Sequence, residues 1–380
     1  MIDVRSGKPV WALGLMSGTS LDGIDAALLR TDGQTISDFG MSSFLPFRGG
    51  DLTALPKIWA DWTRYRDAAG SDAITVAEAG QEVDALHAMA SASLLIHEVE
   101  PPEVIGYHGQ TVGHAPEDGF TWQIGDGAAV ARALNRPVVW DFRTQDMTAG
   151  GQGAPLAPFY HYALAKWLGA AQPLAILNIG GVGNVTWIDP ALGDAADPGA
   201  CVAFDTGPGN ALVNDWVVAQ TGQPFDRDGG FASCGTVHSN LTSGNFGTSF
   251  LARPGPKSLD RNDFQGVLAA VEGLSTEDGA ATLTAFTAEC VAASVQHMPA
   301  PPNRWLVGGG GRHNATMMAM LADRLDAQVD PVEAVGLDGD MLEAQAFAYL
   351  AVRVLRGLPT SAPSTTGCSE PVCGGRISYP

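Results

Sequence analysis

The chain has 380 residues, of which 45% are hydrophobic and 16% charged, so it can bury apolar cores in two domains. Its formal net charge of −20 argues against a nucleic-acid-binding protein, because such proteins present a basic face to the phosphates. The sequence shows neither a signal peptide nor a run of about 18 apolar residues, so we expect a cytoplasmic protein without membrane partners.

The first elements along the chain are a predicted strand at residues 10–16, a glycine-rich turn and a second strand at 24–29. The four lysines lack the spacing of a P-loop, so phosphate binding would have to use backbone N–H groups. A polar hairpin turn without any ligand explains this motif equally well. The candidate phosphate ligands in it are Gly18, Thr19, Ser20, Leu21, Asp22, Gly23, Ile24 and Asp25.

Residues 51–99 have a helical pattern, and a short strand at 104–107 leads into a group of neutral polar side chains. His108, Gln110 and Thr111 offer donors and acceptors that suit sugar hydroxyls. His108 and His114 do not indicate a metal site, since no cysteine or acidic cluster joins them.

After a helix at 127–134 and a strand at 138–141, Arg143 stands at a strand end. There it could grip a carboxylate through two hydrogen bonds, although arginine is more often a surface residue.

The second half repeats the pattern of strand, glycine turn and strand at 174–188, which indicates a duplicated two-domain design. Asn184 in this second turn could donate to a phosphate oxygen. Asp205 ends a strand at 202–204 and precedes a glycine-rich turn, where it suits a general base. An aspartate at this place also suits a helix cap, and the sequence pattern slightly favours the cap.

A strand at 305–307 precedes the tract from Gly308 to Gly311 and a helix that begins near Asn314. Four consecutive glycines leave room for a flat ring against the backbone, so we favour a nucleotide site over a simple turn. The apolar pattern predicts a helix over 342–356, with Glu343 four residues before Phe347 on the face expected to point inward. Residues 361–380 are expected to be irregular.

Together these motifs resemble the anhydro-N-acetylmuramic acid kinase family, in the family's order and over nearly the whole chain. Departures are modest: Asp126 stands where the family often has Asn, Arg312 follows the glycine tract where a smaller residue is common, and the loop at 191–200 is local. The matching segments are 14–23, 108–111, 123–125, 141–143, 150–156, 178–181, 204–205, 207–210, 226–229 and 308–310.

The resemblance implies an α/β fold with two RNase H-like domains, as in actin-like ATPases, and a nucleotide and sugar cleft between them. We place the first domain at 1–142, joined by the C-terminal segment 357–380, and the second at 143–356. The resemblance makes Asp205 the catalytic base. The expected ATP-binding residues are 18–25, Gly181, Asn184, Gly207, Gly209, Asn210, Gly308, Gly309, Gly310 and Asn314, and the expected sugar-binding residues are His108, Gln110, Thr111, Gly125, Arg143 and Glu343.

The implied reaction uses ATP and Mg²⁺ to open 1,6-anhydro-N-acetylmuramic acid with water and to phosphorylate O6, as in peptidoglycan recycling. An ordinary hexose or amino-sugar kinase of the same superfamily is the second hypothesis. A nucleotide-gated binding module is a third, but the chain has no room for a separate peptide-binding domain. The expected partners are the sugar and ATP, and a homodimer is left open.

Overall fold

The computed structural model describes residues 7–67, 69–96, 101–242, 248–259 and 264–380, and the contacts of the chain divide it into two compact units. Unit 1 comprises Met1–Trp167, Asp194–Ala196 and Met341–Pro380, and unit 2 comprises Leu168–Gly193 and Asp197–Asp340. The contact-defined boundary therefore differs from the expected one between residues 142 and 143. Residues 143–167 and the long helix before residue 356 group with unit 1 because they pack on its sheet.

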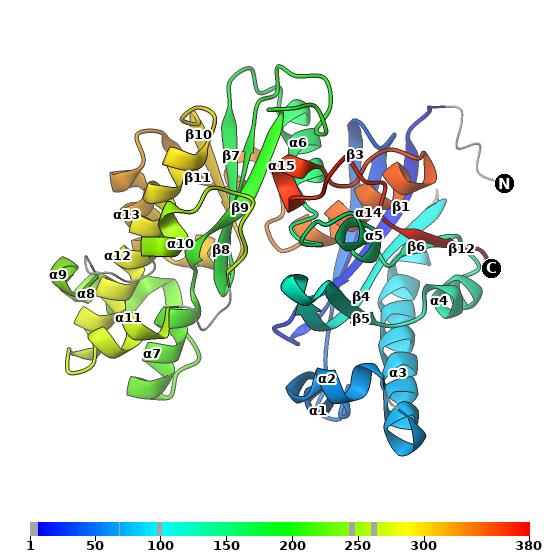
Figure 1. The fold of residues 1–380 in the computed structure, drawn as a ribbon, viewed down its shortest axis with the longest axis horizontal. Coiled ribbons are helices and arrows are strands. Elements are labelled where there is room, and N and C mark those ends of the chain that lie inside the picture. The colour runs from blue at the N-terminus through cyan, green and yellow to red at the C-terminus, as the bar shows by residue number, and fades with distance from the viewer. Residues whose placement is uncertain (1–6, 68, 97–100, 243–247, 260–263) are drawn as a thin grey trace. The chain divides into compact units, whose positions relative to one another are not determined.

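Unit 1 is built on one mixed sheet with the order β12-β6-β4-β1-β2-β3, in which β5 also pairs with β4 (Figure 1). β1 and β2 form the predicted hairpin, and β1, β4 and β6 run parallel. The strands are β1 (Val10–Ser17), β2 (Gly23–Thr31), β3 (Ile36–Pro46), β4 (Val104–Ala115), β5 (Phe120–Ile124), β6 (Val138–Trp140) and β12 (Arg376–Ser378). The helices are α1 (Leu55–Ala60), α2 (Trp62–Arg66), α3 (Gly70–Leu95), α4 (Gly127–Leu134), α5 (Thr144–Thr148), α6 (Pro158–Trp167), α14 (Leu342–Leu355) and α15 (Pro363–Thr366).

The two faces of this sheet are covered by different helices, as the two-residue period of a strand requires. Leu13 and Ile105 join a core with Val83 of α3. Gly14 and Gly106 face α14 instead, and a Cβ at either one would clash with the backbone carbonyl of Ala344 or Phe347. Glycine is required here because α14 lies directly on the strands.

Unit 2 contains a second mixed sheet with the order β11-β10-β7-β8-β9 (Figure 1). Its core joins the sheet to α12 and α13, and a second cluster lies among α7, α8, α11 and α12. The strands are β7 (Leu174–Ile179), β8 (Val182–Ile188), β9 (Cys201–Pro208), β10 (Arg304–Gly308) and β11 (Gln328–Pro331). The helices are α7 (Ala211–Thr221), α8 (Gly230–Cys234), α9 (Ser239–Thr242), α10 (Thr248–Ala252), α11 (Gln265–Ala270), α12 (Thr276–Ser294) and α13 (Ala315–Arg324).

The two sheets share one topology. The order β3-β2-β1-β4-β6 in unit 1 corresponds to β9-β8-β7-β10-β11 in unit 2. In each set the first three strands are antiparallel and the last two continue parallel to the central one. The duplicated α/β design expected from the repeated hairpin is confirmed.

Three local expectations need correction. β4 extends to Ala115, so residues 108–111 lie inside the strand and not after it. The segment 361–380 is not wholly irregular, because it forms α15 and adds β12 to β6 as an antiparallel edge strand. Glu343 is exposed in the first turn of α14, whereas Phe347 is buried, so Glu343 is not part of the packed face of this helix. Neighbouring atoms nevertheless raise the pKa of its carboxyl by burial, and the carboxyl interacts with the charge of Arg143.

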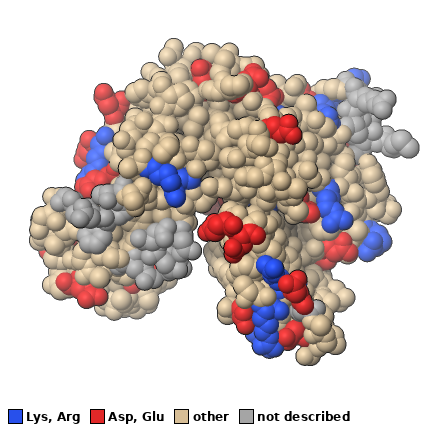
Figure 2. All heavy atoms as spheres, viewed as in Figure 1, with Lys and Arg blue, Asp and Glu red and all other residues tan. Residues whose placement is uncertain are grey.

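Within the described residues no helix has the length and apolar character that spanning a membrane requires. On the face shown in Figure 2, lysine and arginine lie in small separate groups, which agrees with the acidic net charge of the chain.

Candidate active site

Two glycine turns of unit 2 are bonded to each other at one edge of its sheet. The turn between β7 and β8 holds Gly180 and Gly181, and the end of β9 leads into Gly209 and Asn210. The N–H of Gly209 donates to the carbonyl of Gly181 at 3.0 Å, and that of Asn210 to Gly180 at 2.7 Å. Asn210 Nδ2 also donates to the carbonyl of Ile179 at 3.1 Å.

The third turn, which follows β10, lies next to the end of β7, close to the first two turns. Gly309 has φ 69°, and a Cβ there would lie 2.7 Å from the carbonyl oxygen of Ile179. Since β7 and β10 are parallel, their carboxyl ends meet at one sheet edge, where α/β proteins bind their ligands. The structure thus brings the predicted nucleotide turns of unit 2 together.

The glycines in these turns are of two kinds. A Cβ at Gly207 would lie 2.8 Å from the Cβ of Cys290, so that glycine is needed for packing. A Cβ at Gly18, Gly181 or Gly310 would meet no atom closer than 3.4, 3.9 and 3.7 Å, respectively. The protein's own packing therefore does not require glycine at these three positions. Glycine is expected at such positions where a ligand approaches the backbone closely.

Two residues beside the third turn have structural duties. Asn314 is 6% exposed and caps α13, because its Oδ1 accepts the N–H of Met317 at 2.9 Å. Its expected role in binding the nucleotide stays a prediction, and the cap leaves the side-chain N–H groups of Asn314 for it. Arg312, a departure from the family pattern, is buried and donates to Glu333 at 2.7 Å, Asp340 at 2.8 Å and the carbonyl of Gly309 at 3.0 Å. Arg312 therefore stabilises the turn by linking the carbonyl of Gly309 to Glu333 and Asp340.

Asp205 lies within β9, opposite Asn184 of β8, and does not cap α7, whose cap residue is Asn210. Its N–H donates to the carbonyl of Lys257 at 3.0 Å, and its Oδ2 accepts the N–H of Leu259 at 2.8 Å. Burial raises the pKa of Asp205 to about 7, although the N–H of Leu259 and the charge of Lys257 favour the ionised form. A carboxylate with this pKa suits a general base near neutral pH.

In unit 1 the turn after β1 is short and tied to β4. Gln110 is fully buried, accepts from Ser17 Oγ at 2.7 Å and donates to the carbonyl of Gly18 at 3.2 Å. Gln110 therefore shapes the turn, whereas we had expected it to hold sugar. Asp22 is exposed and accepts from Ser20 Oγ at 2.7 Å, while Ile24 belongs to the core and could offer a ligand only its backbone.

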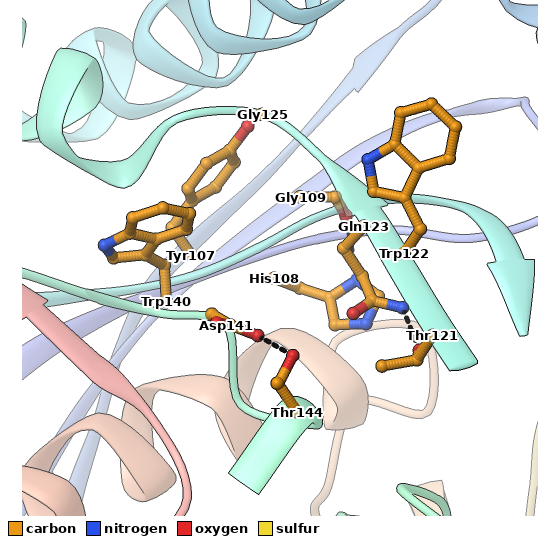
Figure 3. Close-up of a pocket in the computed structure, with 10 residues that line it drawn as sticks. All are labelled: Tyr107, His108, Gly109, Thr121, Trp122, Gln123, Gly125, Trp140, Asp141 and Thr144. Atoms are coloured by element: carbon orange, nitrogen blue, oxygen red, sulfur yellow. Dashed lines mark hydrogen bonds between the residues drawn. The ribbon is translucent and has the colours of Figure 1, made fainter. Parts of the chain in front are cut away.

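Unit 1 also contains a pocket of about 260 Å³ beside β4 and β5, shown in Figure 3. Aromatic rings and polar groups share its wall, a combination that suits a sugar because the rings cover its apolar faces and the polar groups reach its hydroxyls. His108 and Gly125 were expected here, whereas the remaining lining residues were not assigned a role. The lining residues are Tyr107, His108, Gly109, Thr121, Trp122, Gln123, Gly125, Trp140, Asp141 and Thr144.

The wall of this pocket is braced from α3. Tyr107 Oη donates to Asp84 at 2.7 Å, and Asp84 also accepts the N–H of Asp126 at 2.9 Å. Gly125 has φ 132°, and any side chain there would collide with Tyr107. Asp126 caps α4 through the N–H of Ala128 at 2.9 Å, a duty that asparagine performs equally well, so this departure from the family leaves the pocket unchanged.

His108, which lines the pocket, and Arg143 are joined by hydrogen bonds. Arg143 donates to His108 Nε2 from Nε at 3.1 Å and from Nη2 at 2.9 Å, and its Nη1 donates to the carbonyl of Gly153 at 2.7 Å. His108 Nδ1 donates to the carbonyl of Gly109 at 2.8 Å, so the ring is neutral with Nε2 as acceptor. Burial and the neighbouring guanidinium hold the pKa of His108 well below its usual value.

Both ring nitrogens of His108 are engaged, Nδ1 by the carbonyl of Gly109 and Nε2 by the guanidinium of Arg143. Burial lowers the pKa of Arg143 to about 10, while Glu343 and Asp146 oppose that shift, so the guanidinium stays charged at neutral pH.

A buried carboxylate holds the loop that Arg143 contacts. Asp146 accepts the N–H of Gly153 at 2.7 Å, Ser361 Oγ at 2.5 Å and Thr366 Oγ1 at 2.6 Å. The loop is thereby tied to the C-terminal segment of the chain, which fixes the carbonyl that Arg143 binds.

Two α/β units of one strand order, each opening on a hairpin with a glycine turn, define the actin-like class of ATP-binding folds, to which sugar kinases belong. The class expected from the sequence is confirmed.

The comparison with known proteins narrows this class to one family. The family model for anhydro-N-acetylmuramic acid kinase matches residues 10–380. The protein of that name from Roseobacter denitrificans is 51% identical over 372 residues, covering 98% of this chain and 95% of the relative. The one from Ruegeria sp. is 50% identical over 377 residues, covering 99% and 97%. The chain belongs to the anhydro-N-acetylmuramic acid kinase family.

Among solved structures, component A of (R)-2-hydroxyglutaryl-CoA dehydratase from Acidaminococcus fermentans aligns with 91% of this chain and 99% of its own. Its TM-score is 0.44 at 11% identity, a likeness too remote to bear on function.

Proposed function

We propose that the protein is an ATP-dependent kinase that opens 1,6-anhydro-N-acetylmuramic acid with water and phosphorylates O6. The product is N-acetylmuramic acid 6-phosphate, an intermediate in the recycling of peptidoglycan. The family match over residues 10–380 carries this proposal. The partly buried Asp205, with its pKa near 7, supplies the base that such a reaction needs.

ATP would be held mainly by backbone. In unit 2, Gly181 and Gly310 leave their backbone open to the phosphates, because no side chain stands in the way there. In unit 1, Gly18 leaves its backbone open in the same manner. Asp22 is exposed in the turn that contains Gly18, so its carboxylate would serve as a ligand of Mg²⁺, which takes only one or two protein carboxylates when a nucleotide supplies the other oxygens. When bound, Mg²⁺ neutralises charge on the transferred phosphoryl group.

The proposed chemistry needs one base. In the substrate a bridge joins C1 to O6, so O6 carries no proton. Asp205 takes a proton from water while the water oxygen bonds to C1, and the C1–O6 bond breaks. O6 then attacks the γ-phosphorus of ATP, and ADP leaves. Coupling these steps avoids the release of a poor alkoxide leaving group.

The pocket of unit 1 would hold the sugar. Three of the five N–H groups of Arg143 are engaged by His108 and Gly153, and the remaining two would bind the lactyl carboxylate of the muramic sugar. Glu343, which is exposed and interacts with the charge of Arg143, would contact a sugar hydroxyl.

Arg143→Lys is expected to raise KM for the muramic sugar by about tenfold or more, because an ammonium group cannot copy the planar grip of a guanidinium. The same change should leave KM for an analogue without the lactyl group nearly unchanged. Steady-state kinetics with both sugars decide this. Equal weakening of both would mean that Arg143 only supports His108 and Gly153.

The function itself is tested by incubating the protein with ATP, Mg²⁺ and the anhydro sugar in water labelled with heavy oxygen. We expect a phosphorylated product with the label at C1. Because Asp205 must be ionised, kcat/KM should fall as the pH drops through about 7. An ordinary hexose kinase would phosphorylate a free sugar hydroxyl and take up no label.

We further infer that the protein works in the cytoplasm, where ATP is available. A homodimer remains a prediction that light scattering would test.

A further inference from the structure

Lys257 is an unusual residue in unit 2 because its whole side chain is buried, with 3% exposed. Its Nζ donates to the carbonyl of Phe250 at 3.0 Å and to that of Leu251 at 3.3 Å. The same Nζ lies 4.6 Å from the ring centroid of Phe250 and 5.6 Å from that of Phe204. Two carbonyls and two aromatic faces thus hold a cation inside the protein.

The segment that begins at Lys257 contacts Asp205 on two sides. The carbonyl of Lys257 accepts the N–H of Asp205, and the N–H of Leu259 donates to the carboxylate at 2.8 Å. The Lys257 side chain meanwhile packs on Phe204, the neighbour of Asp205 in β9. Anchoring Lys257 therefore fixes both the backbone and the carboxylate of Asp205.

Among the residues that the structure describes, Lys257 is the cation whose charge acts on Asp205. Arg253 lies on the other aromatic neighbour, 5.3 Å from the centroid of Phe250, and donates to the carbonyl of Ser258. From α12, the Cys290 thiol interacts with the charge of Lys257, and Glu289 interacts in turn with Cys290. His297 Nε2 binds the carbonyl of Leu251 at 2.6 Å, the carbonyl that Lys257 also uses.

We propose that Lys257 is a positioning residue for the reaction: it anchors the segment that holds the Asp205 carboxylate, and its ammonium group keeps that carboxylate ionised for proton removal. This inference rests on the proposed role of Asp205. The mutual effects agree with it, because the charge of Lys257 lowers the pKa of Asp205 while Asp205 raises that of Lys257. Burial, and then Arg253, lower the pKa of Lys257 to about 8.

The test compares pH profiles of kcat/KM for the wild type, Lys257→Met and Lys257→Gln. Methionine keeps the packing between the rings, and glutamine keeps a donor for the carbonyls without a charge. In both variants the pH at which kcat/KM falls on acidification, called the acid limb here, should rise by about one unit. This is the lower end of the pKa shift that a nearby opposite charge causes. Activity should then fall about tenfold below the limb and converge with the wild type above pH 8, where wild-type Lys257 itself loses its proton.

Two further variants complete the design. Lys257→Arg keeps the charge and should restore the wild-type limb. Lys166→Met removes an exposed lysine that also lies over an aromatic ring, that of Tyr162, and should leave the profile unchanged. Thermal melting of each variant shows that it is folded, and the glutamine variant serves if the methionine variant is not.

An equal loss at every pH, or an unmoved acid limb, would overturn the inference, because packing alone does not depend on the ionisation of Asp205. Asp205→Asn, assayed in parallel, separates this failure from a failure of the proposed function. An inactive Asp205→Asn with an unmoved limb in both neutral Lys257 variants would refute only the role of Lys257. An active Asp205→Asn would refute both.

Discussion

Asp205→Asn is expected to abolish turnover, with a loss of about 10²–10⁴-fold in kcat. The amide has nearly the size of the carboxylate, and its oxygen can still accept the N–H of Leu259, but it cannot take a proton from water. ATP affinity and melting temperature should therefore stay near those of the wild type. Steady-state kinetics and calorimetric titration with ATP measure the two effects separately.

The matched control is Asp326→Asn, which removes an exposed carboxylate from the same unit and should leave kcat unchanged. If Asp205→Asn kept more than half of the wild-type activity, another group would have to be the base.

Gly18→Val is expected to lower ATP affinity by at least about tenfold while the protein remains folded. The structure has space for the side chain, since a Cβ at Gly18 would come no closer than 3.4 Å to Ser20 Oγ. The loss should arise only when a phosphate approaches the backbone, because a β-branched side chain then stands in its place. Asp22→Ala should weaken the binding of ATP with Mg²⁺ as well, because it removes a carboxylate proposed to bind the metal ion.

Calorimetry with ATP checks both changes, and Gly49→Val serves as the control. Gly49 belongs to unit 1, and a Cβ there would meet no atom within 4 Å. Unchanged ATP affinity in Gly18→Val and Asp22→Ala would mean that this turn is only the connection between two strands.

The duplicated fold could be predicted from the sequence because its signal is local. Each unit opens on two apolar strands joined by a glycine turn, and both hairpins form as expected. The unit boundary could not be placed this way. The helix α14 follows unit 2 in the chain but packs on β1 and β4, and no local pattern reveals contacts between segments so far apart in the sequence.

In the candidate site, too, residues in local motifs could be predicted, whereas residues that act through distant contacts could not. Asp205, Gly18 and Arg143 could be singled out because they stand in recognisable motifs, and their roles stay predictions. Three residues that support the site from behind were missed: Lys257 beside Asp205, Asp146 at the loop that Arg143 contacts, and Asp84 behind the pocket wall. They lie in unremarkable sequence and acquire their contacts only in three dimensions. Trp140 and Trp122, both adjacent to motif residues, were the one signal in the sequence that could have located the pocket wall.

The packing of α14 against the first strands also sets the order in which the protein can fold during synthesis. Apart from the short segment Asp194–Ala196, the chain between the N-terminal and C-terminal parts of unit 1 belongs to unit 2, so unit 2 can fold before α14 has been synthesised. Proteins are synthesised at about 5–20 residues per second, so on the order of ten seconds or more pass between the synthesis of β4 and that of α14. During this interval the helix that covers Gly14 and Gly106 is missing. During that time one face of a nascent sheet is uncovered, and a chaperone that shields it should increase the yield of folded protein.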